Sequence, residues 1–143
     1  MVRTRRATNQ APGICDGLDR RFGCRRVIKD DKSIPLGVDY RRYIEDVIPH
    51  CRAVVAIMGP GWLSGRSDSD ARPLDDPQDL VRAELLAAFR SRIRVIPLLV
   101  GGAAMPAAES LPEPLRDLSY RQGLTIRSGT DFGRDMERLL AEL

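Results

Sequence analysis

The chain has 143 residues, of which 43% are hydrophobic and 30% are charged; this is the length and composition of one soluble globular domain. We expect a single domain over residues 1–143, whose core needs neither disulfides nor a structural metal. No apolar stretch is long enough to span a bilayer. No N-terminal run has the pattern of a signal peptide, so we expect a cytoplasmic protein that makes no contact with a membrane.

Positive charge gathers at the start of the chain. The net charge is +3, yet residues 1–26 hold seven arginines and two aspartates, while the remainder has a balance of −2. A basic end can bind nucleic acid, but no aromatic residues alternate with these arginines and no nucleic-acid motif is present. We therefore expect no nucleic-acid partner and favour a solvated basic edge, with dinucleotide phosphates as an alternative counter-charge.

The three cysteines, Cys15, Cys24 and Cys51, give no sign of a metal site. They lack Cys-x-x-Cys spacing, and the single histidine, His50, cannot complete the four ligands that a zinc site needs. We expect reduced cysteines that fill the core, and no bound metal.

The first part of the chain predicts two helices with a short strand between them. Apolar residues recur at helical spacing over 14–22, and Gly23 ends that helix. Residues 25–28 predict a strand, and the turn-rich run 29–37 follows it. Asp39 then caps a second helix. The apolar positions of that helix are Tyr40, Tyr43, Ile44, Val47 and Ile48.

A buried strand and a third helix come next. The continuous apolar run 53–58 is typical of a strand that is covered on both faces. After the polar loop 59–76, Asp76 is an N-cap and Pro77 the first helical residue, which predicts a helix from there to Arg90.

The last part of the chain predicts two strands and a helix. Residues 93–100 predict a strand in which Pro97 indicates an edge position or a bulge. A loop with one or two helical turns follows, then a short strand over 122–126, and a helix capped by Thr130 or Asp131. Strands that alternate with helices predict a parallel sheet with helices on both faces. Ligands of such sheets bind beyond the carboxyl ends of the strands.

Glu84 is the carboxylate that stands out. It lies midway along the third predicted helix among apolar neighbours, where desolvation raises the pKa of a carboxyl group and strengthens its hydrogen bonds. From the pattern alone, the alternative is a boundary carboxylate paired with Arg82 or Arg90. The glycines form no nucleotide-binding fingerprint and are interpreted as turn residues.

Five segments, in order and with fitting spacing, carry a family resemblance. They are Val27–Tyr40, Gly59–Leu63, Asp76–Leu85, Val95–Gly102 and Met105–Leu118. The first resembles the second strand and "BB loop" of bacterial TIR (Toll/interleukin-1 receptor) domains, and the second resembles the segment after their third strand. The third resembles their third helix, whose glutamate matches Glu84, and the last two continue the match.

The resemblance implies a flavodoxin-like, doubly wound parallel sheet with strand order 2-1-3-4-5. It also implies an NAD+ glycohydrolase, with ADP-ribose or a cyclic form of it as product, in bacterial defence or virulence signalling. In catalytic members the glutamate that matches Glu84 supports cleavage of the nicotinamide–ribose bond. Nicotinamide leaves as a neutral base, so one carboxylate can suffice by stabilising the oxocarbenium-like transition state. NAD+ is then a substrate, and no cofactor is required.

The resemblance also assigns substrate-binding positions. Arg5 and Arg6 match an arginine pair near the pocket and would face the pyrophosphate. Trp62 would stack on a ring, with a plug over the core as its alternative role. Leu80 stands where some catalytic members have an aromatic residue.

One loop has two implied roles. Asp31 and Ser33 lie in the part of the loop that is expected to gate the pocket and bind substrate. Pro35 and Gly37 give the loop its turn, and in the family this loop mediates association between TIR domains.

The first strand departs from the family pattern. The family has an apolar run that ends in a Ser-Tyr-Arg-Arg-like motif, whereas this chain offers only Met1–Arg6. A central strand should be apolar on both faces, and Arg3 is charged. We therefore expect a shortened first strand and an atypical or truncated start over residues 1–13.

Two functions follow from the resemblance. The first is the NAD+-cleaving enzyme, a hydrolase or cyclase that acts on self-assembly, as a homo-oligomer or filament. The second is a non-catalytic interaction module that binds other TIR domains through the loop 29–38. The two are compatible, because the family's active sites are often completed by a neighbouring subunit.

Overall fold

A computed structural model describes residues 2–4, 10–23, 34–64 and 72–143. Within these ranges, four parallel strands form one sheet in the order β1-β2-β3-β4. The strands are β1 (Val2–Thr4), β2 (Ala53–Met58), β3 (Arg94–Val100) and β4 (Leu124–Ile126). The order agrees with 2-1-3-4-5 for these four strands, and the predicted strand 25–28 lies outside the described residues. Val2–Thr4 of β1 pair with Val55–Ile57 of β2, and the residues on either side of β1 lie outside the described ranges, so the shortened first strand stays a prediction.

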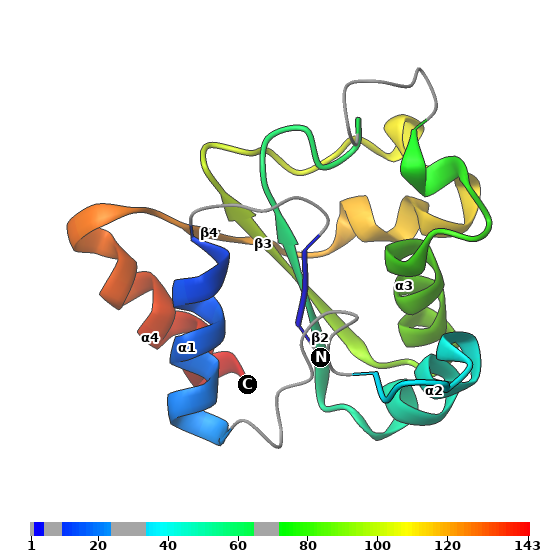
Figure 1. Ribbon diagram of the computed structural model, residues 1–143. Coiled ribbons are helices and arrows are strands. Elements are labelled where there is room, and N and C mark those ends of the chain that lie inside the picture. Colours follow the sequence, from blue (N-terminus) through cyan, green and yellow to red (C-terminus); the bar gives the residue numbers. More distant parts are fainter. Residues whose placement is uncertain (1, 5–9, 24–33, 65–71) are drawn as a thin grey trace.

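Helices cover both faces of the sheet, which makes three layers (Figure 1). One face carries α1 (Ala11–Phe22) and α4 (Phe132–Glu142), and the other carries α2 (Tyr40–Val47) and α3 (Leu80–Arg90). The 3-10 helices are η2 (Ile48–His50), η3 (Pro73–Asp75), η4 (Ala108–Ser110), η5 (Glu113–Tyr120) and η6 (Gly129–Asp131). This mixed α/β architecture is compatible with the flavodoxin-like fold.

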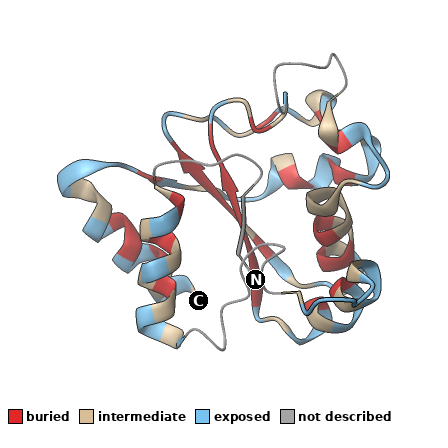
Figure 2. Cartoon of the chain, in the orientation of Figure 1, coloured by how far each residue is buried: buried red, intermediate tan, exposed pale blue. Residues whose placement is uncertain are grey.

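The strand β2 divides the core into two clusters. All six of its residues are buried, as the apolar run predicts, because β2 lies between two strands and two helical layers (Figure 2). Val55 and Ile57 pack with α1 and α4, whereas Val54, Ala56 and Met58 pack with α2, α3 and η5. The alternation follows from the period of two in a strand.

The predicted ends of the first two helices are confirmed. Gly23 follows α1 with a φ of 82°, and its N–H donates to the carbonyl oxygen of Asp19; this left-handed conformation suits glycine. The Asp39 carboxylate caps α2 by accepting a hydrogen bond from the N–H of Arg41 at 3.0 Å.

The helix that carries Glu84 begins later than predicted, at Leu80 instead of Pro77. Its N-cap is Asp79, whose Oδ1 accepts from the N–H of Arg82 at 2.8 Å. Asp76 instead stabilises a local turn, in which its Oδ1 accepts a hydrogen bond from the N–H of Gln78 at 2.8 Å. Both aspartates can cap a helix or form a turn. The helix begins after Asp79, the aspartate nearer to the buried residues of α3.

β3 is an interior strand, but at Pro97 it is paired on its β2 side alone, so the predicted edge position holds locally and not for the whole strand. β3 pairs with β2 along its length, with Pro97 opposite Ala56, and with β4 from Leu98 onward. The proline thus lies one residue before the β3–β4 ladder begins, where it has no bond of that ladder to interrupt. Among the described residues, none of the helices has both the length and the apolar character needed to cross a membrane.

Candidate functional site

Glu84 is an interior carboxylate. Its side chain has no exposed surface, and Leu85, Ala87 and Ala88 of the same helix are buried with it. In Figure 1, α3 runs opposite to the strand arrows, so the half of the helix that holds Glu84 lies toward the carboxyl ends of the strands. Parallel α/β sheets bind their ligands at this edge.

The boundary interpretation of Glu84 does not fit this placement. The guanidinium of Arg82 is directed to the preceding turn, where Nη1 donates to the carbonyl oxygens of Leu74 at 2.9 Å and Asp75 at 3.1 Å. Arg90 is exposed, whereas Glu84 is fully buried. The Glu84 carboxyl group therefore lies inside the protein, where electrostatic interactions are stronger than at a surface.

A second buried carboxylate, Asp135, has a structural role. Its Oδ2 accepts hydrogen bonds from the N–H of Arg127 at 2.8 Å and from Nε of the same residue at 3.0 Å, and its Oδ1 accepts from Nη2 at 2.7 Å. These hydrogen bonds lower the pKa of Asp135 to about 2. Three donors from Arg127 hold α4 to the end of β4. We therefore assign Asp135 a structural role.

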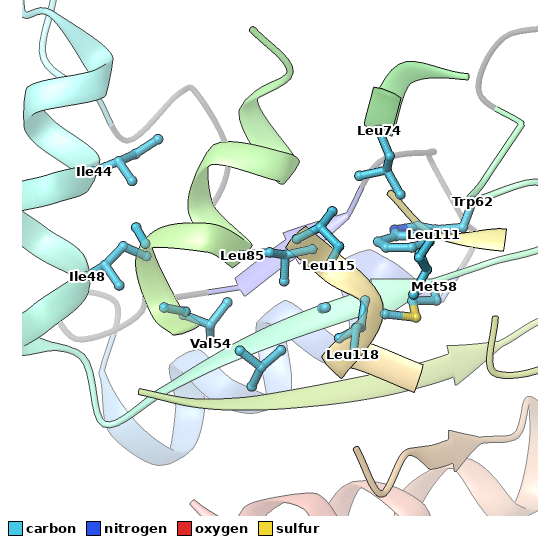
Figure 3. Close-up of a cluster of buried hydrophobic side chains, with 14 of the residues drawn as sticks. Ile44, Ile48, Val54, Met58, Trp62, Leu74, Leu85, Leu111, Leu115 and Leu118 are labelled. Atoms are coloured by element: carbon cyan, nitrogen blue, oxygen red, sulfur yellow. The ribbon is translucent and has the colours of Figure 1, made fainter. Parts of the chain in front are cut away.

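Trp62 occupies the position of a core plug. It is 4% exposed and belongs to the cluster of α2 and α3. Figure 3 shows its ring among Met58, Leu74 and Leu111. The backbone turns tightly to place it there, with the N–H of Trp62 donating to the carbonyl oxygen of Gly59 at 3.0 Å. Stacking of Trp62 on a ligand ring stays a prediction, and it requires this loop to open.

The turn before α2 is exposed and apolar. The N–H of Val38 donates to the carbonyl oxygen of Pro35 at 3.3 Å, and Gly37 has a φ of 80°, so these residues shape the turn as predicted. The side chain of Leu36 is fully exposed at 101%, and that of Val38 is 45% exposed.

A hydrogen bond joins the start of α2 to the turn before α3. The Tyr40 hydroxyl, on the first residue of α2, donates to the carbonyl oxygen of Gln78 at 3.2 Å. Leu80, a predicted substrate-binding residue, is half-buried two residues further on. The first residue of α2 is thus hydrogen-bonded to the turn that leads into the helix of Glu84.

Gln10 is a residue that sequence reasoning missed. Its Nε2 donates to the carbonyl oxygen of Ile126 at 2.9 Å, and its Oε1 accepts from the N–H of Gly101 at 3.0 Å. Gln10 therefore ties the start of α1 to the carboxyl ends of β3 and β4. No local pattern could reveal it, because its partners are 91 and 116 residues away.

The remaining predicted site residues, Arg5, Arg6, Asp31 and Ser33, lie outside the described residues. In the parts of the chain that are described, no group of three or more His, Cys, Asp or Glu side chains is arranged to hold a metal ion. No protein-family model matches the chain, and a search of curated proteins finds no match.

Proposed function

We propose that this chain is a TIR domain that cleaves NAD+ into nicotinamide and ADP-ribose, with Glu84 as the catalytic carboxylate. The observation that carries the proposal is the complete burial of Glu84 in the first half of α3, the helix that precedes β3. The parallel sheet with helices on both faces supports it, and so do the five TIR-like segments in the sequence.

The proposed reaction needs one carboxylate. The bond between ribose C1′ and the nicotinamide nitrogen breaks, both electrons go to the cationic nitrogen, and nicotinamide leaves neutral. Water then adds its oxygen to C1′ and releases a proton, or an adenine nitrogen takes the place of water and gives a cyclic product. The Glu84 carboxylate would hold the ribose hydroxyls and stabilise the positive charge that develops at C1′. A dry site strengthens this stabilisation.

The remaining contacts to NAD+ are part of the same proposal. Arg5 and Arg6 would bind the pyrophosphate, since guanidinium groups match phosphate oxygens in charge and geometry. Asp31 and Ser33 would contact the substrate from the loop before α2. Leu80 and Trp62 would supply apolar surface, with Trp62 reaching the ligand only if its loop opens.

Access to Glu84 requires a rearrangement. A side chain without exposed surface cannot touch a nucleotide, so segments around it must move before the reaction. We propose that self-association drives this movement, because the exposed Leu36 lies shortly before Tyr40 in the chain, and Tyr40 is hydrogen-bonded to Gln78 next to the start of α3. Activity should therefore rise steeply with protein concentration.

The test is nicotinamide release from NAD+ at high protein concentration. Wild type should release nicotinamide, Glu84→Ala should not, and Glu137→Ala should behave as wild type because Glu137 is an exposed residue of α4. Equal background release from wild type and Glu84→Ala would overturn the enzymatic proposal.

A specific observation favours a second function, a non-catalytic module for TIR–TIR association. Leu36 and Val38, two large apolar residues of one turn, are both exposed, and exposed apolar surface can mark an interaction site. Pro35→Ala and Gly37→Ala should each weaken self-association in sedimentation experiments. Association that is unchanged in both variants would remove the support for this function.

A further inference from the structure

A groove of 380 Å³ lies between α2 and α3. Its floor is apolar and is formed by Ile44 of α2 with Ala83 and Ala87 of α3. Ala83 and Ala87 are four residues apart on one face of α3, and their small side chains leave space between the helices. Ile44 and Ala87 are buried, so the floor is part of the folded core.

Fixed elements form the wall of the groove. Tyr40 and Gln78 both line it, and the hydrogen bond between them, at 3.2 Å, holds α2 to the turn before α3. Pro77 adds a rigid ring beside them. The groove is therefore built from residues that the fold keeps in place.

Positive charge borders the apolar floor. Arg41 and Arg90 line the groove with one acidic residue, Glu45, and all three are exposed. Across the described ranges, neither guanidinium forms a hydrogen bond or an ion pair. Of the other two arginines near the end of α3, Arg92 is exposed and Arg94 is paired with Glu142, and neither lines the groove. The local field of the groove thus favours an anion.

We propose that the groove binds a small organic anion, with a flat apolar body on the alanine floor and a carboxylate, sulfonate or phosphate group between Arg41 and Arg90. The volume lies within the range of ligand sites, which is about 300–1,000 Å³. Arginine is suited to this role, because its guanidinium binds oxyanions through two donors and stacks on aromatic rings. Glu84 does not line the groove, so this site is separate from the proposed NAD+ site and stands or falls without it.

The direct test is a fluorescence titration of the whole chain with 1-anilinonaphthalene-8-sulfonate, an aromatic anion. Its neutral analogue N-phenyl-1-naphthylamine serves as the comparison. We expect saturable binding of the anion and clearly weaker binding of the neutral probe. The double variant Arg41→Gln/Arg90→Gln should weaken binding of the anion at least about tenfold, because it removes two charge-assisted contacts.

The matched control is Arg42→Gln/Arg138→Gln, which removes the same charge from exposed positions of α2 and α4 outside the groove. A second variant, Ala83→Leu, fills the floor at a half-buried position and should block the probe. Circular dichroism checks that each variant is folded. Absence of saturable binding to wild type, or equal weakening in the control and the Arg41/Arg90 variant, would overturn the proposal.

Discussion

The Tyr40 hydroxyl donates a hydrogen bond to the carbonyl oxygen of Gln78 at 3.2 Å. Tyr40 begins α2 directly after the exposed turn 35–38, and Gln78 lies two residues before α3. This hydrogen bond therefore joins the start of α2 to the turn before α3, and it adds to the packing of the two helices in one core cluster. A partner that binds at the turn could therefore shift the start of α3, through α2 and this hydrogen bond.

The Tyr40 contact should contribute measurably to stability. Tyr40→Phe removes only the hydroxyl, and it should lower the free energy of unfolding by about 0.5–1.5 kcal/mol, the usual net value of one hydrogen bond. Urea denaturation measures the change. Tyr43→Phe is the control, because within the described residues the Tyr43 hydroxyl has no hydrogen bond. An equal loss in both variants would mean that the contact contributes nothing specific.

Trp62 is the single tryptophan, so its fluorescence reports directly on the core plug. A side chain that is 4% exposed should emit at short wavelength and be quenched only weakly by acrylamide. Trp62→Ala should lower the free energy of unfolding by about 3–5 kcal/mol, since it leaves a large cavity. Emission typical of water-exposed indole in the folded protein would show that the loop 59–64 is open.

The clamp between Arg127 and Asp135 predicts a pH dependence of stability. The pKa of Asp135 is lowered to about 2 in the folded protein, from an ordinary value of 3.8. The contribution of this group is therefore fully present above the ordinary value and is lost as the pH falls from there to about 2. Asp135→Asn should lower the thermal midpoint at pH 7, and the difference from wild type should shrink below pH 4.

The control for that experiment is Asp131→Asn. Asp131 also faces Arg127, at 3.2 Å, but both side chains are well exposed. Exposed ion pairs contribute little to stability, so this variant should have a smaller effect at pH 7. A difference between Asp135→Asn and wild type that is the same at pH 7 and pH 2 would contradict the assignment.

Gln10 should hold the carboxyl edge of the sheet together. Gln10→Leu removes both hydrogen bonds, to Gly101 and Ile126, and should lower the free energy of unfolding by about 1–3 kcal/mol. Gln10→Glu keeps the acceptor for Gly101 and should fall between Gln10→Leu and wild type. Gln122→Leu, at an exposed position, is the control. If chemical denaturation gives Gln10→Leu and Gln122→Leu the same free energy of unfolding, Gln10 does not stabilise this edge of the sheet.

Local patterns predict much of the fold. The apolar run of β2, the Asp39 cap of α2 and Gly23 after α1 all depend on neighbouring residues, and the structure confirms each of them. The start of α3 is predicted three residues too early, because Asp76 and Asp79 are both able to cap a helix and only the packing of the helix decides between them.

The candidate site is predicted less completely. Glu84 could be selected from its apolar neighbours, and its burial fits that selection. The roles of Gln10 and Asp135 could not be predicted, because they depend on partners brought together by folding. The sequence allows Trp62 to be a core plug or a stacking ring, and only folding shows that the ring is buried beside Met58 and Leu111; stacking on a ligand stays a prediction.

The proposed function requires that Glu84 acts chemically on NAD+. The most direct measurement is the initial rate of nicotinamide release over a series of protein concentrations, for wild type, Glu84→Gln and Glu137→Gln. Glu84→Gln preserves the size of the side chain and removes its charge, so the rate should fall by about 100-fold or more. Wild type and Glu137→Gln should share one rate that rises more steeply than in proportion to concentration. Equal rates for wild type and Glu84→Gln, or no release at any concentration, would contradict the claim.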